Sequence, residues 1–248
     1  RIEVLGADTD ASPYDSGSYA SSTTYITGKA VEKACQKLIA RILEIASGML
    51  EAPVEELVFA SDHVEWPKEQ KSVSLEDIGT KSMCGNGCAL EVTESNTSPT
   101  SPPPFMAGAV EIELDKETGH VEILDYKAVV DCGTVVNPNL ARVQAEGGLV
   151  QGIGMTLYEN IQYNEKGKML NNSFMQYKVP SRRDMGNLQV EFESSYEDNG
   201  PFGAKSIGEV VINTPTSAIA SAIKHATGVQ VRTLPITAEK VLLGKENE

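Results

Sequence analysis

The residue with the clearest potential for acid–base chemistry is Glu209. It ends the loop 200–209, directly after Ile207 and Gly208, and three apolar residues follow it. Apolar neighbours remove water from a carboxylate and disfavour its charged form, which suits it to accept a proton near neutral pH. The alternative is an ordinary surface ion pair between Glu209 and Lys205 in the same loop. The residues alone leave both interpretations open.

A second group of candidate residues is a run of small, mostly hydroxyl-bearing side chains ahead of a predicted helix. Small side chains let main-chain N–H groups approach a ligand closely, and hydroxyls add further donors. The start of a helix also carries a partial positive charge, which favours an anion. A plain capping loop is the alternative, because Ser and Thr are common before helices in any case. The run consists of Ala20, Ser21, Ser22, Thr23 and Thr24.

The segment 144–154 combines two glutamines with an unusual density of glycine. The amides of Gln144 and Gln151 each offer a donor and an acceptor, the combination that recognises the edge of a heterocycle. Each glycine in a helical pattern costs about 1 kcal/mol relative to Ala, so a close approach by a ligand or another helix should offset it. Tight helix packing explains the glycines at least as well. They lie at positions 147, 148, 152 and 154.

The cysteines invite a metal interpretation that the spacing does not support. Cys84 and Cys88 flank a glycine-rich turn, but a structural metal site needs further ligands, typically from a second closely spaced pair. Cys35 and Cys132 are far away in sequence, and the three histidines have no paired spacing. We therefore expect this chain to hold no metal ion through its own side chains.

Composition narrows the class of protein. The 248 residues can form a sizeable core, and the formal charge of −14 argues against a nucleic-acid partner, which would require a basic surface. No apolar run reaches the roughly 18 residues of a membrane span, and the start lacks a signal-peptide pattern. Four scattered cysteines predict a reducing, cytoplasmic setting. Because the chain opens with a strand-like stretch and no Met, we expect a processed or excised C-terminal piece.

Helices are predicted from apolar residues that recur every three or four positions. The longest covers 30–50, with Thr27 as its N-cap and Pro53 after its end. In a later helix, Pro215 stands in the first turn and Gly228 provides the stop. The other helices are expected at about 139–160, at 214–228 and, shortly after Ser74, in a capping-box context.

Strands are predicted from alternating apolar and polar residues. The clearest case is an antiparallel hairpin of 110–114 and 121–130 around a Glu-Thr-Gly turn. No βαβ alternation is present, so the predicted fold class is α+β, with antiparallel β-sheets, packed helices and two lobes. A Ser-, Thr- and Pro-rich stretch at 93–106 marks the lobe boundary. Further strands are expected at 2–5, at 57–66 as a short pair, at 172–178 and at 188–196.

Five strings of the sequence lie at 9–22, 101–105, 137–148, 203–209 and 234–241. In this order, they resemble the C-terminal part of the molybdopterin-binding subunit of the xanthine dehydrogenase and aldehyde oxidase family. Any one string is weak evidence, but five in register over essentially the whole chain are strong. The resemblance implies the fold of the second molybdopterin-binding domain for residues 1–248.

The resemblance also assigns roles to the candidate residues. In that family a glutamate accepts a proton during hydroxylation while the molybdenum cofactor carries the redox chemistry, and Glu209 occupies the position of this general base. Gln144 falls on a further pterin contact. The residues on the loop that contacts pterin and phosphate are Ala20, Ser21, Thr23 and Thr24.

Several parts of such an enzyme have no counterpart in this sequence. The four cysteines are too few for two iron–sulfur clusters, and the substrate-pocket residues of the family are absent. The expected partners are therefore the rest of the molybdenum-binding subunit, which would share the molybdopterin, and chains or domains that carry iron–sulfur clusters and FAD. The isolated chain should be inactive and prone to self-association.

The nature of the substrate stays open at this point. A purine-like heterocycle or an aldehyde is the leading expectation, and carbon monoxide or nicotinate are rivals within the same family. A non-catalytic binding or assembly module that kept the fold but lost the cofactor is the rival from another class.

Overall fold

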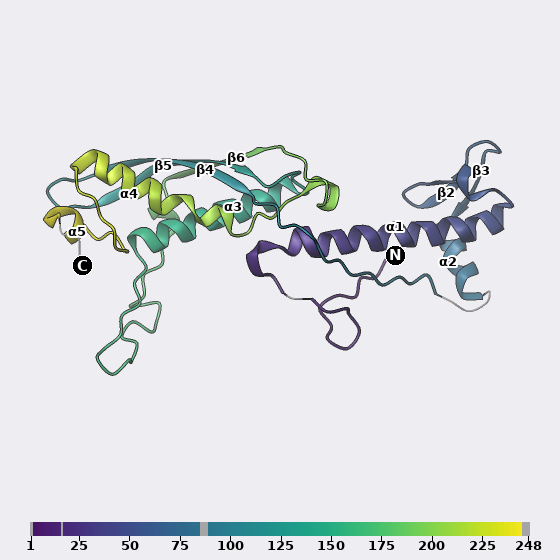
Figure 1. Ribbon diagram of the computed structural model, residues 1–248, viewed down its shortest axis with the longest axis horizontal. Helices are drawn as coiled ribbons and strands as arrows, with labels where there is room; N and C mark the ends of the chain where they lie inside the picture. The colour runs from purple at the N-terminus through teal and green to yellow at the C-terminus, as the bar shows by residue number, and fades with distance from the viewer. Residues whose placement is uncertain (1, 16, 85–88, 245–248) are drawn as a thin grey trace. The chain divides into compact units, whose positions relative to one another are not determined.

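The computed structural model describes residues 2–15, 17–84 and 89–244 (Figure 1). The chain folds into two compact units. Unit 1 comprises Arg1–Gly17 and Thr23–Pro99, whereas unit 2 comprises Ser18–Ser22 and Thr100–Glu248. The short segment Ser18–Ser22 thus belongs to unit 2 although unit 1 surrounds it in sequence. The last boundary falls in the Ser-, Thr- and Pro-rich stretch.

Unit 1 is built on one long helix. Helix α1 (Thr23–Leu50) packs through its second half against a three-stranded antiparallel sheet and a short helix. The core of the unit contains Ile42 and Ala46 of α1 together with Val64 and Ile78. The remaining elements are η2 (Val54–Glu56), β1 (Val58–Phe59), β2 (His63–Trp66), β3 (Lys71–Ser74) and α2 (Leu75–Cys84).

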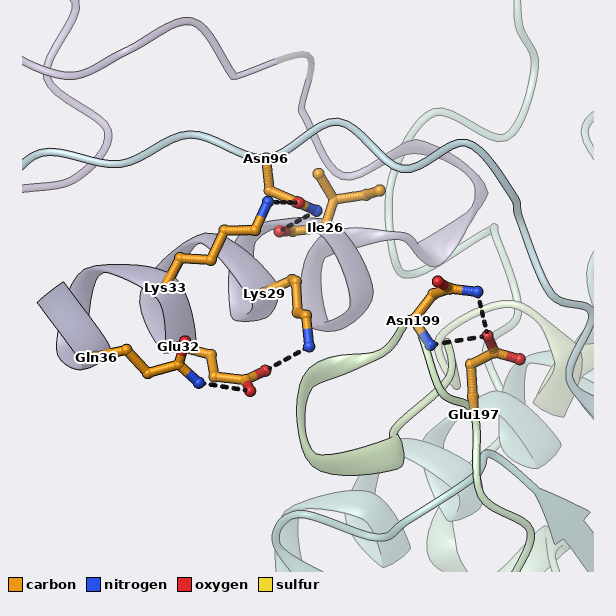
Figure 2. A network of polar contacts seen from close by, with 8 residues as sticks. All are labelled: Ile26, Lys29, Glu32, Lys33, Gln36, Asn96, Glu197 and Asn199. Atoms are coloured by element: carbon orange, nitrogen blue, oxygen red, sulfur yellow. Dashed lines mark hydrogen bonds and ion pairs between the residues drawn. The ribbon is translucent and has the colours of Figure 1, made fainter.

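The first half of α1 is covered by polar contacts with the returning chain. Lys33 Nζ donates to Asn96 Oδ1 at 2.7 Å, and Asn96 Nδ2 donates to the carbonyl oxygen of Ile26 at 3.4 Å (Figure 2). Further along the helix, Lys37 contacts Glu94 and Arg41 contacts the carbonyl oxygen of Glu91. The segment 91–98 therefore runs alongside α1 through hydrogen bonds and ion pairs.

Unit 2 contains a three-stranded sheet in the order β4-β5-β6. Strands β4 (Phe105–Leu114) and β5 (Val121–Asp131) form an antiparallel hairpin, and β6 (Asn187–Glu193) pairs parallel to β5. The β4–β5 register shifts between Glu111 and Ile112, where the buried positions of β5 also change phase. One face of β5 is buried and the other is exposed.

Two helices cover the buried face of this sheet (Figure 1). Helix α3 (Pro138–Leu157) lies in the crossover from β5 to β6, and α4 (Thr214–Thr227) contacts both α3 and β4. Ile153 of α3 and Ile219 of α4 are fully buried in one core with Ile123. Short elements complete the unit: η1 (Tyr19–Ser21), η3 (Arg182–Asp184), η4 (Pro201–Gly203), η5 (Val210–Ile212) and α5 (Ala238–Leu243).

The structure confirms the α+β class, the long hairpin and the major helices, and it corrects several details. The stretch 2–5 is not a strand and finds no partner among the described residues, and 172–178 forms turns. Helix α1 begins at Thr23, so Thr27 is helical and not the N-cap. The β5–β6 pair is parallel, so the sheet of unit 2 is mixed and not wholly antiparallel. Alternation of side chains is the same in both directions and does not encode strand orientation.

Candidate functional site

Glu209 stands at the junction between a glycine-rich loop and the short helix η5. The two residues that follow it, Val210 and Val211, are buried against Ala145 of α3. Glu209 itself is exposed, so the expected burial of its carboxylate is wrong for this chain. The apolar neighbours in sequence direct their side chains into the core and fix the backbone beneath Glu209.

The alternative pairing of Glu209 with Lys205 is also wrong. Lys205 Nζ contacts Asp131 Oδ2 at 2.8 Å, at the end of β5. Burial by itself raises the pKa of Asp131, but hydrogen bonds from Lys205, Ser195 and the Gly133 N–H outweigh it, and the pKa is lowered overall. Lys205 is therefore part of the loop's support.

Gln144 lies on the first half of α3 and reaches the candidate loop. Its Nε2 atom donates to the carbonyl oxygen of Gly208 at 3.3 Å. Helix α3 can begin just upstream because Asn137 Oδ1 accepts from the Leu140 N–H at 3.1 Å and Pro138 occupies the first turn. The predicted pterin contact thus binds the main chain of the residue that precedes the predicted base.

Ser21 lies close to the same glycine. It belongs to the segment Ser18–Ser22, which is part of unit 2. A Cβ atom added at Gly208 would lie 2.7 Å from Ser21 Oγ and 3.8 Å from Gln144 Nε2. Only glycine leaves this space open. We call Ser21, Gln144 and Gly208 the Gly208 cradle.

The backbone before Ser22 adopts an uncommon left-handed conformation at two consecutive residues. Ala20 and Ser21 have φ values of +49° and +55°, which L residues rarely adopt. Ser22 N–H donates to the carbonyl oxygen of Tyr19 at 3.2 Å and closes the turn. Successive residues of opposite backbone hand can form concave arrangements of N–H groups that bind anions. Such a pair is present here, because Ser21 with its positive φ is followed by Ser22 in the right-handed region.

Thr23 and Thr24 are the first residues of α1 and belong to unit 1. The predicted loop 20–24 is therefore a loop only up to Ser22, and its last two residues are helical. The structure thus brings together Ser21, Gln144 and the residue before Glu209 in unit 2, with Ala20 beside Ser21.

Two of the four glycines in α3, Gly148 and Gly152, serve helix packing. A Cβ at Gly148 would lie 2.2 Å from Val211 Cγ2, and one at Gly152 would lie 2.6 Å from Pro215 Cγ. Gly147, by contrast, has open space around it. The close approach of α3 to η5 and α4 is what places Gln144 beside Gly208.

The predicted turn between Cys84 and Cys88 is described only at Cys84. Residues 85–88 lie outside the described residues, so the Cys84–Cys88 motif has no structural account. In the ranges that the structure describes, Cys35, Cys84 and Cys132 are free thiols, and no group of His, Cys, Asp or Glu side chains could hold a metal ion.

Comparison with known proteins gives the family. The model of the molybdopterin cofactor-binding domain matches residues 1–186. The chain is 35% identical over 250 residues to the probable hypoxanthine oxidase XdhD of Escherichia coli K12, covering 99% of this chain and 26% of that protein. It is 33% identical over 240 residues to the putative xanthine dehydrogenase molybdenum-binding subunit XdhA of the same strain, covering 94% and 32%.

A solved structure supports the fold. Reconstituted CO dehydrogenase from Oligotropha carboxidovorans superposes with a TM-score of 0.79 at 24% identity, over 95% of this chain and 30% of that one. The chain belongs to the molybdopterin cofactor-binding domain family, within the xanthine dehydrogenase and aldehyde oxidase group. It spans 26% to 32% of the length of the two Escherichia coli relatives. No described helix is both long and apolar enough to cross a bilayer.

Proposed function

We propose that this chain is the part of a molybdenum hydroxylase that supplies the general base and one wall of the molybdopterin site. The observation that carries this proposal is the Gly208 cradle directly before Glu209. Ser21 comes from one segment and Gln144 from a helix far along the chain, yet both border the same glycine. Because the chain belongs to the molybdopterin cofactor-binding domain family, we interpret this meeting of Ser21 and Gln144 at Gly208 as part of the cofactor site.

The residues of the cradle fit a pterin with its phosphate. The site offers a hydroxyl, an amide with donor and acceptor, and the turned backbone at Ala20 and Ser21. Such groups bind neutral heterocycle edges and anions rather than metal ions. We assign cofactor contact to Ala20, Ser21, Thr23, Thr24 and Gln144, and no metal ligand to this chain. The cofactor, when bound, supplies the redox chemistry of hydroxylation.

Glu209 is assigned the proton-accepting role. Its carboxylate is exposed in the isolated chain, and its backbone is fixed by the buried pair Val210 and Val211. A base must be held within hydrogen-bond reach of the proton that it removes. A fixed main chain with an open side chain meets this requirement once a partner covers the site and excludes water.

Apolar side chains near the cradle support such a partner. Leu140 lies one turn before Gln144 and is 68% exposed, and Val143, directly before Gln144, is 61% exposed. Val136, just before α3, is 62% exposed. An exposed apolar group of this kind fits a protein surface. We assign it to the rest of the molybdenum-binding subunit, with iron–sulfur and flavin components further on. The proposed substrate is a purine-like heterocycle or an aldehyde.

The decisive experiment is Glu209→Gln in the assembled enzyme. Loss of a general base should lower turnover by about 10²–10⁴-fold while molybdenum and pterin contents stay at the wild-type level. Glu113→Gln, an exposed glutamate on β4, is the matched control and should keep full turnover. Turnover that survives Glu209→Gln would end the catalytic assignment. Absence of molybdenum and pterin from the wild-type assembly would instead favour a non-catalytic module.

A further inference from the structure

The Asp131–Lys205 pair is a partly buried ion pair with an unusually complete set of contacts. Lys205 Nζ lies 2.8 Å from Asp131 Oδ2, and the two side chains are only 11% and 18% exposed. Asp131 Oδ1 accepts from Ser195 Oγ at 2.6 Å and from the Gly133 N–H at 3.0 Å. Lys205 also lies over the ring of Phe105, 5.7 Å from its centroid. The carboxylate thus joins three separate segments of unit 2.

The main chain at Lys205 and just before it is also hydrogen-bonded to residues 132–134, which follow β5. The Lys205 N–H donates to the carbonyl oxygen of Cys132 at 2.8 Å, and the Thr134 N–H donates to that of Gly203 at 2.9 Å. Gly133 has a φ of +69°, and a Cβ there would lie 2.4 Å from the carbonyl oxygen of Gly203. Glycine is therefore required at position 133 for this close contact.

The loop has a second anchor only three residues later. Gln144 of α3 holds the carbonyl oxygen of Gly208, and Val210 and Val211 are buried directly beyond Glu209. Between Lys205 and Gly208 the chain has just two residues. A span this short cannot shift at one end without moving the other, so the position of Glu209 depends on both anchors.

We propose that Asp131 and Lys205 are positioning residues, whose ion pair fixes the loop that presents Glu209. This inference rests on the proposed function of Glu209. Neither residue touches the reacting atoms in this role. Each acts through the backbone, since loss of either charge leaves a mostly buried partner without compensation and loosens the bonds at Cys132 and Thr134.

The ordinary alternative is that the pair only stabilises the unit as a whole. The two ideas differ in where the effect of a substitution appears. A positioning role confines the change to residues 203–209, whereas a general structural role spreads it over the sheet. The lowered pKa of Asp131 is consistent with a carboxylate that stays charged at neutral pH in either case.

The test uses Asp131→Asn, Lys205→Met and the double variant in the assembled enzyme. Asp125→Asn is the matched control, because Asp125 lies on the same strand and forms an ion pair with Lys127 at 3.3 Å. Amide hydrogen exchange is measured for 203–209 and for the β4–β5 hairpin. Turnover, KM and the pH profile of kcat are measured beside it.

The expected result is exchange at Ala204 and Lys205 at least about tenfold faster in both single variants, with the hairpin unchanged. kcat should fall by about tenfold or more. KM and the shape of the pH profile of kcat should be retained, because Glu209 is still present. The double variant should lose no more than either single one, since the pair acts as a unit. Asp125→Asn should match wild type in every readout.

Three outcomes would overturn the proposal. They are unchanged exchange at 203–205, equal acceleration across the whole β4–β5 hairpin, and additive losses in the double variant. The Glu209→Gln result is read separately. If Glu209→Gln retained turnover while exchange at 203–209 responded as expected, the assigned role of Glu209 would fail and the anchoring of the loop would stand.

Discussion

The side-chain amide of Gln144 donates to the carbonyl oxygen of Gly208 at 3.3 Å, across 64 positions of sequence. Helix α3 therefore holds the residue that immediately precedes Glu209. Ser21 borders the same glycine from a third segment. The geometry of the candidate site thus depends on three segments, distant in sequence, that meet at Gly208. A larger side chain at position 208 tests this dependence.

Gly208→Ala should disturb the cradle. The added methyl group would lie 2.7 Å from Ser21 Oγ and 3.0 Å from Ser21 Cβ, so one of the two segments must move. We expect a loss of bound molybdopterin, measured as pterin fluorescence and molybdenum per chain. Adding Ser21→Gly removes the clashing atoms and relaxes the positive φ at that position. The double variant should fold as well as wild type, and a single variant with full cofactor content would contradict the prediction.

Two adjacent glycines of α3 should respond in opposite directions to the same substitution. Gly148→Ala places a methyl group against Val211 and should lower the free energy of unfolding by about 1–3 kcal/mol through overpacking. Gly147→Ala meets open space and should raise it by up to about 1 kcal/mol through helix propensity. Denaturant unfolding of the two variants provides the measurement. Equal effects would show that the close approach of α3 and η5 does not govern stability here.

The ring of His63 should make unit 1 sensitive to pH. Hydrogen bonds to Asp62 at 2.6 Å and to Glu65 at 2.7 Å, followed by their charges, raise the pKa of His63 above its ordinary value of 6.5. The protonated form is favoured in the folded state. Its contribution to stability is therefore fully present below about pH 6.5 and is lost as pH rises through the folded pKa.

His63→Gln provides the comparison for this effect. The difference in melting temperature between wild type and His63→Gln should be larger at pH 5.5 than at pH 9, and an NMR titration of the ring should give a midpoint above 6.5. A midpoint at or below the ordinary value would refute it.

Asp131 should act in the opposite pH range. Its lowered pKa, set by hydrogen bonds that outweigh burial, means that it stabilises the fold above the unfolded value of about 3.9. This contribution is lost as pH falls through the lowered folded pKa. Wild type should thus lose its advantage over Asp131→Asn on acidification below about pH 4, as followed by thermal unfolding. If the difference in melting temperature between wild type and Asp131→Asn stayed the same at all pH values, the assignment would be contradicted.

Local sequence patterns were enough to predict the elements that hold the site. The helix expected at about 139–160, the alternation in the β4–β5 hairpin and the stop at Gly228 each depend on near neighbours in the chain, and the structure agrees with all three. In α4, Ile219 and Ile223 are buried, whereas Ala226 in the last turn is exposed.

Contacts between distant segments were not predictable in the same way. Lys205 and Asp131 are 74 positions apart, and no spacing rule links them. The exposure of Glu209 was missed because its apolar neighbours in sequence are buried while its own side chain is not. Ser21, Gln144 and Glu209 could be selected one by one, but only the fold shows that Gly208 is where two of them meet.

The assignment of Ser18–Ser22 to unit 2 has a practical consequence for anyone who wishes to dissect this chain. A recombinant piece that starts at Thr100 would carry Gln144 and Glu209, yet it would lack the serine that borders Gly208. A deletion that joined Gly17 to Thr23 would remove the same serine while leaving every strand of the larger sheet in place. Truncation experiments must therefore retain this five-residue insertion, or supply it as a separate peptide, before any loss of ligand is attributed to the remainder of the domain.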